Sequence, residues 1–375
     1  MPKIPFLHPN SPKLSEARDA LREIEHSGVL SNYGPVNTRL EREILESMFD
    51  GRGACLTVCN ATTGLMMAIK HCTGEARAPR RYALMPSFTF AAPAHAAIWC
   101  GLTPLFCDID PHDWAASEAA ERELLDRYGE EVAVVVPYAT FGNCIDLKRY
   151  EKLAAEYGVA VVIDAAASLG SICEDGFGFG TGCPFPIVYS MHATKAFATT
   201  EAGLIYCTDV DAVNELRAMA NFGFAGKRVA MMPGLNGKLN EITALMALLK
   251  LKELASSVEH RTKIATLYSK ELPELTFQQV SGRRHAFMFV SVLLPAELAG
   301  PRPEVLRRLA ADGVEARTYF SPHVAEQPYF HGRSLSGDLT VTNDVACRIL
   351  SLPLSDFITE EQVHIVCAAL RNALA

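Results

Sequence analysis

The feature that most limits the possible folds is an alternation of short apolar runs with helical segments between about residues 36 and 209. The apolar runs contain few polar residues, as strands buried on both faces do; they are ACLTV, YALMP, TPLFCDI, VAVVVP, VAVVID and PIVYSM. Segments with helical periodicity lie between them, namely GPVNTRLEREILESMF, TTGLMMAIKHC, FAAPAHAAIWCG and DLKRYEKLAAEYG. This alternation predicts an α/β fold with a largely parallel sheet that helices cover on both faces.

The length of 375 residues predicts two domains, since single cores stop growing at roughly 250 to 300 residues. A long helical segment, LNEITALMALLKLKELASSVEHRTKIATLYSKEL, leads out of the alternating region. After it come HAFMFVSVLL, a helical segment over residues 303–312, VEARTYF and a last helix over residues 359–374. We therefore expect a large domain over residues 1–250 and a smaller C-terminal α+β domain over residues 251–375.

Charge and cysteine usage exclude several classes of function. The formal net charge is -8 and no basic block is present, which argues against binding of nucleic acid or of an anionic membrane surface. No signal peptide and no apolar run of roughly 20 residues is visible, so we expect a cytoplasmic protein. The 11 cysteines are scattered through apolar segments without CxxC or zinc-type spacing. We expect buried reduced thiols and no metal site.

Polar residues follow three of the predicted strands, and open α/β sheets bind ligands at the carboxyl ends of their strands. Residues 60–64 follow ACLTV where a helix begins, so they are either a phosphate-binding helix start or a plain N-cap at Asn60 or Thr62. Asp164 follows VAVVI, and its carboxylate is either a ligand group or the cap of a helix that starts at Ala165. Lys195 follows PIVYSM; alone, it would be read as a surface lysine.

The three groups together are those that pyridoxal phosphate requires. A lysine forms a Schiff base with the cofactor, a carboxylate holds its pyridine nitrogen protonated, and a helix start binds its phosphate. An aromatic side chain that covers the ring is available in PSFTFAAP, which offers Phe88 and Phe90, although both are also explained as core residues. The combination predicts a site for this cofactor at the carboxyl edge of the sheet.

At these residues the sequence resembles the DegT/DnrJ/EryC1/StrS family of pyridoxal-phosphate-dependent sugar aminotransferases, which have the aspartate-aminotransferase fold (fold type I). The resemblance extends from GPVNTRLE to LPLSDFITEEQV and includes PSFTFAAPAHAAIWCGLTPLFCDID, FGNCIDLKRYEKLAAEYGVAVVIDAAASLG, YSMHATKAFATTEAGLIYCTD and GLNGKLNEITALMALLKLKEL. It implies that Lys195 is the Schiff-base lysine, that Asp164 is the partner of the pyridine nitrogen, and that Phe90 stacks on the cofactor ring.

The resemblance also implies how the cofactor phosphate is bound and how the protein assembles. Ala61 and Thr62 would offer their backbone N–H groups, and Ser190 would add its hydroxyl. Asn236, in GLNGKLNE, matches an asparagine that family members extend into the active site of the neighbouring subunit. A homodimer with shared active sites is thus implied.

Several positions depart from the family pattern. Ala167 stands where the family usually has Gln or His near the phenolic oxygen of the cofactor, and Ala139 stands where many members have His. Lys238 replaces an arginine and lacks its planar bidentate fork. The phosphate-loop SGT becomes NAT at residues 60–62, and Ala202 replaces a glycine. These changes leave Lys195 and Asp164 in place and bear on substrate recognition.

The implied reaction transfers an amino group from an amino acid, expected to be L-glutamate, to a keto sugar carried on a nucleotide, in amino-sugar biosynthesis for a surface polysaccharide or a secondary metabolite. The amine of Lys195, once free, would move the proton. Lys227, Arg228 and Lys238 are candidates for the anionic donor or a pyrophosphate, and a solvated basic loop is their alternative. His323 falls near a substrate-side segment of the family.

Four alternatives stand beside this prediction. The scaffold could serve a regulatory or binding role, given Ala139, Ala167 and Lys238, or act with pyridoxal phosphate on a non-sugar substrate. Some family members are dehydratases with histidine in place of the lysine, and the presence of Lys195 favours transamination. A dinucleotide loop at residues 175–182 fits poorly, because it leads into a predicted strand and not into a helix.

Overall fold

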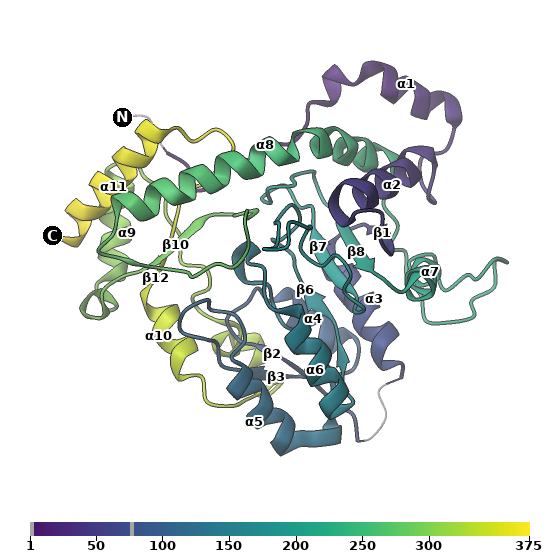
Figure 1. The fold of residues 1–375 in the computed structure, drawn as a ribbon, viewed down its shortest axis with the longest axis horizontal. Coiled ribbons are helices and arrows are strands. Elements are labelled where there is room, and N and C mark those ends of the chain that lie inside the picture. The colour runs from purple at the N-terminus through teal and green to yellow at the C-terminus, as the bar shows by residue number, and fades with distance from the viewer. Residues whose placement is uncertain (1–3, 76–78) are drawn as a thin grey trace.

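Two sheets that meet at residues 160–164 form the centre of the larger part of the molecule in the computed structural model, which describes residues 4–75 and 79–375 (Figure 1). The first sheet has the order β1 (Ala54–Val58), β8 (Gly203–Cys207), β7 (Ile187–Ser190), β6 (Ile163–Asp164). The second has the order β11 (Leu335–Ser336), β3 (Thr103–Cys107), β2 (Tyr82–Pro86), β4 (Val132–Val135), β5 (Ala160–Val161). Val162 N donates to Val135 O at 3.0 Å, so β5 and β6 form one extended segment that joins the sheets.

The combined sheet is mostly parallel, which confirms the expected α/β class. Parallel pairs join β11 to β3, β3 to β2, β2 to β4, β4 to β5 and β6 to β7. The exception is β8, which is antiparallel to both of its neighbours, β1 and β7. The alternation in the sequence did not single out β8 as a strand.

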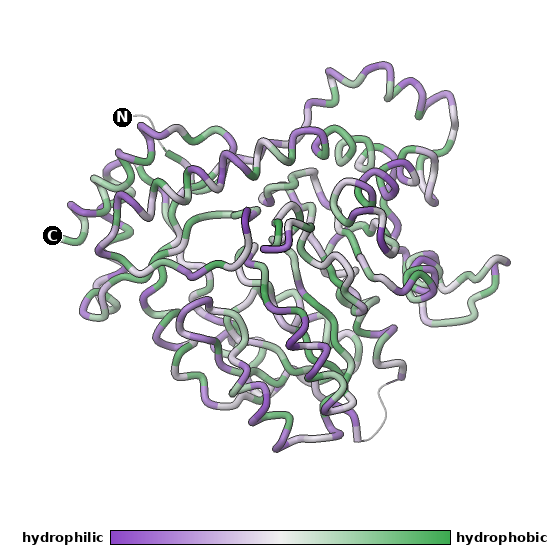
Figure 2. The backbone as a smooth tube through the Cα atoms, viewed as in Figure 1, coloured by the Kyte–Doolittle hydropathy of each residue, from purple (hydrophilic) through white to green (hydrophobic). Residues whose placement is uncertain are grey.

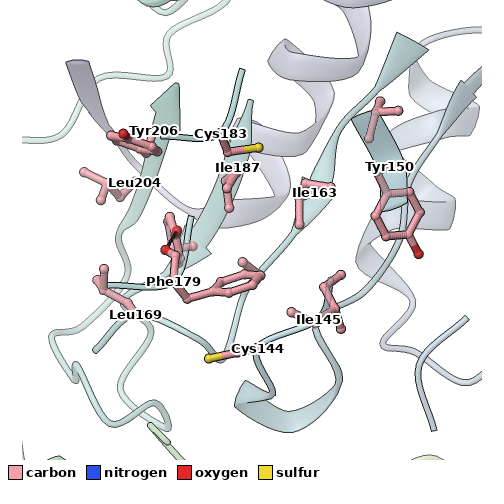
Figure 3. Packing of buried hydrophobic residues seen from close by; sticks show 14 of the residues in the cluster. Cys144, Ile145, Tyr150, Ile163, Leu169, Phe179, Cys183, Ile187, Leu204 and Tyr206 are labelled. Atoms are coloured by element: carbon pink, nitrogen blue, oxygen red, sulfur yellow. Dashed lines mark hydrogen bonds between the residues drawn. The ribbon is translucent and has the colours of Figure 1, made fainter. Parts of the chain in front are cut away.

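The strand residues alternate between two hydrophobic cores, one on each face of the sheet. Val134, Val162 and Val188 lie in one core, which is covered by α3 (Ala61–Thr73), α4 (Ala92–Trp99) and α7 (Val210–Met219). Val135, Ile163 and Tyr189 lie in the other, which is covered by α2 (Pro35–Phe49), α5 (Glu118–Tyr128), α6 (Leu147–Tyr157) and part of α8 (Glu241–Glu271). Figure 3 shows this second core, with side chains of β6, β7 and β8 around Phe179. The predicted helices on both faces are present.

Side-chain caps start the helices that matter for the site. Asn60 accepts a hydrogen bond from Thr63 N at the start of α3, and Asn240 accepts one from Thr243 N at the start of α8. The start of α2 is capped from outside, because the carboxylate of Glu241 accepts from Val36 N and Asn37 N at 2.8 and 2.9 Å. The beginnings of α2 and α8 are therefore fixed to each other.

The long helix α8 runs along one side of the molecule and leads to the C-terminal part (Figure 1). There a three-stranded sheet of order β12 (Ile349–Leu352), β10 (Val290–Leu293), β9 (Thr276–Phe277) is accompanied by α9 (Arg302–Ala311), α10 (Thr340–Arg348) and α11 (Glu360–Leu374). Along α8 hydrophilic and hydrophobic residues alternate, whereas hydrophobic colour is dense in the central strands (Figure 2). The α+β composition expected for this part is present.

Two segments cross between the parts. β11 lies in the C-terminal third of the chain but pairs with β3 of the large sheet, and Ile4 forms a bridge with Val314 of the C-terminal part. The small helix α1 (Arg18–Ser27) packs against α8. A division at residues 250 and 251 stays a prediction, and it would fall inside α8.

All eleven cysteines are free thiols, as expected, but not all are buried. Cys347 is exposed, and the partly exposed ones are Cys59, Cys72, Cys100 and Cys173. Within residues 4–75 and 79–375, no helix is long and apolar enough to cross a membrane.

Candidate active site

One edge of the large sheet collects the predicted site residues. β1, β7 and β6 run in the same direction, since both β1 and β7 are antiparallel to β8 and β6 is parallel to β7. The carboxyl ends of these strands and the amino end of β8 therefore lie at one edge. The carboxyl ends of β2 and β4 lie at the same edge. These two strands are parallel to each other, and β4 is parallel to β5, which forms one segment with β6. Open sheets bind their ligands at such an edge.

Asp164 and Lys195 face each other at this edge and shift each other's titration. The side chain of Asp164, which is 2% exposed as a residue, accepts a hydrogen bond from Ala166 N at 3.1 Å. Burial raises the pKa of Asp164 to about 6, although Ala166 N–H and the charge of Lys195 act in the opposite direction. Burial lowers the pKa of Lys195 to about 8, although the charge of Asp164 acts to raise it. The structure thus brings the two predicted catalytic residues together.

Lys195 lies in a closed loop over residues 191–200. Thr199 N and Thr199 Oγ1 both donate to Met191 O, at 3.0 and 2.6 Å, and Ala193 N donates to Thr200 O at 3.0 Å. These bonds hold the ends of the loop together. The amine therefore projects from a backbone that is fixed on both sides.

The start of α3, Ser190 and Gly203 form a cradle suited to an anion. Gly203 pairs with Ser190 on one side and with Val58 on the other. A Cβ atom on Gly203 would lie 2.8 Å from Ala61 N, so only glycine lets α3 begin this close to β8. Thr63 N is used by the cap Asn60, whereas the amides of Ala61 and Thr62 precede the first intrahelical bond.

Ser190 completes the cradle. Its Oγ accepts a hydrogen bond from His192 N at 3.2 Å, so its own hydroxyl proton is left for another acceptor. Together, two backbone N–H groups and one hydroxyl at a helix N-terminus are a suitable set of donors for a phosphate. Gly203 was not singled out in the sequence; the glycine spacing alone carried no signal for it.

Small and apolar side chains surround the Lys195–Asp164 pair. Ala139 N donates to Asp164 O at 2.8 Å, and both Ala139 and Ala167 are buried. Met288, which sequence reasoning missed, lies with its Sδ 2.8 Å from Lys195 Nζ. It comes from the segment before β10, 93 residues away in the chain, so no local pattern announces this contact.

The two phenylalanines of PSFTFAAP have different environments. Phe88 is fully buried and packs edge-on against Phe141 and Phe320, which makes it a core residue. Phe90 is 61% exposed and lines a cavity of about 330 Å³ together with Arg317 and residues 318–322. Phe90 is therefore the one of the two that is free to cover a ligand.

Asn236 and Lys238 lie on a segment beside the end of β1. Lys238 Nζ donates to Asn236 Oδ1 at 2.7 Å and lies 4.7 Å from the centre of the Phe222 ring. The segment is held to β1, because Cys59 N donates to Gly237 O at 2.7 Å. Lys227 and Arg228 precede this segment in the chain and are exposed.

His323, which the family resemblance places near the substrate, is a buried residue that joins two elements. It is 1% exposed, its Nδ1 is hydrogen-bonded to Ser87 Oγ at 2.8 Å, and its Nε2 to Asn343 Oδ1 at 2.9 Å. Both ring nitrogens are thus used within the protein. This geometry ties the end of β2 to α10, and a substrate-side role for His323 stays a prediction.

The loop over residues 175–182, weighed as a dinucleotide site, is a structural turn. Tyr189 Oη donates to Phe179 O at 2.5 Å, and a Cβ atom on Gly178 would lie 2.1 Å from Met48 O. The glycines here allow close packing against α2 and β7. Within residues 4–75 and 79–375, no group of three or more His, Cys, Asp or Glu is arranged to hold a metal ion.

Comparisons with known proteins show the family and the fold that this chain matches. The model of the DegT/DnrJ/EryC1/StrS aminotransferase family matches residues 13–371. Protein Rv3402c of Mycobacterium tuberculosis (strain ATCC 25618 / H37Rv) is 32% identical over 100% of this chain and 90% of that protein. The dTDP-4-amino-4,6-dideoxy-D-glucose transaminase of Escherichia coli is 28% identical over 96% of each. A Bacillus cereus ATCC 10987 structure assigned as a PLP-dependent aminotransferase is 39% identical over 98% of this chain and 100% of that chain, with a TM-score of 0.92.

Proposed function

Because the chain belongs to the DegT/DnrJ/EryC1/StrS aminotransferase family, we propose that it is a pyridoxal-phosphate-dependent aminotransferase that moves the amino group of L-glutamate to the keto group of a nucleotide-linked sugar. The observation that carries the proposal is the joint placement of Lys195, Asp164 and the anion cradle at one sheet edge. The dTDP-sugar of the Escherichia coli relative supports a nucleotide-linked acceptor.

The residues present fit pyridoxal phosphate. The amides of Ala61 and Thr62 with the hydroxyl of Ser190 would hold its phosphate, and the space that Gly203 leaves without a Cβ lets them converge. Asp164 would face its pyridine nitrogen and Phe90 would cover its ring. When bound, pyridoxal phosphate supplies an electron sink that stabilises negative charge on the carbon next to the transferred nitrogen.

Lys195 Nζ holds and moves the proton in the proposed reaction. With a pKa of about 8, roughly one amine in ten is unprotonated at pH 7, against about three in ten thousand at an ordinary value of 10.5. The same site therefore offers a nucleophile for an aldehyde and a base for a substrate C–H group. The carboxylate of Asp164 would balance positive charge on the Lys195 amine or on the pyridine nitrogen of the cofactor, whichever carries the proton.

We place the working enzyme in the cytoplasm as a homodimer in which Asn236 and Lys238 of one subunit reach the site of the other. Exposed apolar side chains near this segment support an interface; they are Val29, Leu30, Phe222, Val229 and Met231. Free cysteines support a reducing compartment.

The test begins with purified protein supplied with pyridoxal phosphate. We expect the visible absorbance of a lysine-bound cofactor, its loss in Lys195→Ala, and its conversion by L-glutamate to the amine form. A panel of keto sugars on different nucleotides then identifies the acceptor. If wild-type protein neither binds the cofactor nor responds to any amino acid, the aminotransferase proposal is wrong, and a regulatory or binding role on this scaffold takes its place.

A further inference from the structure

A buried charged cluster is connected to the proposed active site by hydrogen bonds and takes no part in the mechanism above. We call it the Asp356 cluster; its members are Asn10, Lys250, Ser257, Arg261 and Asp356. Lys250 is 0% and Arg261 3% exposed, and the side chain of Asp356 is 6% exposed. Lysine and arginine are almost never buried this fully without paired groups that require them.

Asp356 is the centre of the cluster. Its Oδ1 accepts from Arg261 Nε at 2.6 Å, and its Oδ2 accepts from Lys250 Nζ at 2.9 Å, Ser257 Oγ at 3.0 Å and Asn10 Nδ2 at 2.9 Å. Burial alone would raise the pKa of Asp356, but the charges of Arg261 and Lys250 and the bond from Asn10 hold it well below its usual range. The carboxylate therefore stays ionised and fixes the groups around it.

Arg261 carries this rigidity towards the active site. Its Nη1 donates to Phe287 O at 2.8 Å, while its Nε remains bound to Asp356. Phe287 precedes Met288, whose Sδ lies 2.8 Å from Lys195 Nζ. One path of contacts thus leads from the carboxylate of Asp356 through the planar guanidinium of Arg261 and the backbone of residues 287 and 288 to the amine of Lys195.

The same cluster reaches the other side of the lysine loop. Asn10 is followed by Ser11, whose Oγ donates to Thr199 O at 2.7 Å. Thr199 in turn closes the loop over residues 191–200 through its two bonds to Met191 O. The N-terminal segment and the segment around Met288 are therefore held against the lysine loop by one carboxylate.

We propose that the Asp356 cluster is a positioning device for Lys195: through Arg261 and Phe287 it holds Met288 against the amine, so that the amine stays out of water. This inference rests on the proposed function in that Lys195 is the reactive amine. Arg261 and Met288 are positioning residues and make no contact with the reacting atoms of a substrate in this scheme. The thioether suits the task because it is apolar, flexible and accepts only a weak hydrogen bond.

The pKa of Lys195 reports the contact with Met288 directly, because the charged groups near the amine stay the same when that contact is lost. Asp164 acts on the amine from β6, and the phenol of Tyr138 lies close enough to Asp164 to feel its charge. His192, on the lysine loop, pairs with Glu201, which directly follows the loop, at 3.4 Å between Nε2 and Oε1. Met288 is uncharged. A loss of its contact therefore changes the exposure of the amine to water and leaves the surrounding charges as they were.

The test uses Arg261→Lys and Met288→Ala in the full chain. The second-order rate of bond formation between cofactor-free protein and pyridoxal phosphate is measured against pH, which reports the free-amine fraction of Lys195. We expect both variants to raise the apparent pKa of Lys195 by one or more units, so that the rate at pH 7 falls about tenfold per unit while the plateau at high pH is kept. The double variant should show no further shift.

Two matched variants separate positioning from general damage. Arg348→Lys removes the same kind of contact elsewhere, since Arg348 also joins a carboxylate, Asp344, to a backbone carbonyl, Leu294 O. Met288→Leu keeps an apolar side chain of similar size over the amine. Both should titrate as wild type does.

The outcomes distinguish the two proposals. If wild-type protein does not bind pyridoxal phosphate, the proposed function fails before this inference is reached. If wild type binds and Met288→Ala titrates like Met288→Leu, or the shifts of Arg261→Lys and Met288→Ala add in the double variant, the positioning device is refuted. Should Arg261→Lys fail to fold, Ser257→Ala, which removes one hydrogen bond to Asp356 Oδ2, takes its place in the same comparison.

Discussion

Replacement of Asp164 by Asn should make the cofactor-free protein more stable while it abolishes amino transfer. The carboxyl group is 2% exposed, and burial raises its pKa from 3.8 to about 6. One pKa unit corresponds to about 1.4 kcal/mol, so the ionised form costs up to about 3 kcal/mol at neutral pH. Asparagine keeps the shape and the acceptor for Ala166 N, but loses the attraction to Lys195. We therefore expect the free energy of unfolding of the cofactor-free protein to rise by about 1–3 kcal/mol at neutral pH.

The pH dependence gives the sign of this effect. Because the folded-state pKa of Asp164 is raised, the folded protein holds a proton between about pH 3.8 and 6 that the unfolded chain has already lost. The cost of the charge is absent below this window and complete above it. The advantage of Asp164→Asn should therefore be full at pH 8 and shrink as the pH falls through about 6.

Urea unfolding of cofactor-free protein, followed by circular dichroism at pH 8 and pH 5, measures the difference. Asp356→Asn is the matched control, because the pKa of that buried carboxyl is lowered and its loss leaves Lys250 and Arg261 without an anion. Its replacement should cost about 3–5 kcal/mol. If Asp164→Asn is less stable than wild type at pH 8, or its advantage does not change with pH, the assignment of Asp164 as an uncompensated buried charge is refuted.

Three further results are expected. Gly203→Ala, whose Cβ would lie 2.8 Å from Ala61 N, should weaken cofactor binding at least tenfold, whereas Gly300→Ala, which meets nothing within 4 Å, should not; equal affinities in equilibrium dialysis would contradict the cradle. The rate of cofactor loading at Lys195 should rise about tenfold per pH unit below about 8 and then level off, and a flat profile would speak against a buried amine. Cys347, the exposed thiol, should react first with a maleimide, as peptide mass spectrometry can show.

The sequence predicted the fold well where a signal is local. The helices α2, α3, α4 and α6 and the strands of the parallel sheet appear as apolar runs or 3.6-residue periods, which any chain segment carries within itself. Strand β8 was missed because GLIYC has no flanking feature that separates it from the lysine loop before it. Its antiparallel direction depends on pairing with β7, which lies just before the lysine loop, and with β1, which lies far away in the sequence.

The site residues also divide into those with a local sequence signal and those without one. Lys195, Asp164 and Ser190 could be placed because each lies at or just after the end of a recognisable strand, and the order of strands puts them at one edge. Met288 and Gly203 could not, since their roles come from contacts with residues more than ninety positions away in the chain. The substrate-side role of His323 stays a prediction; its hydrogen bonds to Ser87 and Asn343 depend on the tertiary fold and carry no local sequence signal.

Asp164 and Asp356 show why burial and function have to be judged from the surroundings. Both carboxylates follow apolar runs and both are nearly inaccessible, yet their pKa values move in opposite directions. Asp356 receives four hydrogen bonds, two of them from buried cations, so its charge is fully compensated and its role is to hold segments in place. Asp164 receives one backbone bond and the charge of Lys195, which leaves part of the cost of burial uncompensated. A positively charged ring nitrogen of a cofactor would supply the missing partner, so the instability of the empty site becomes affinity for that ligand.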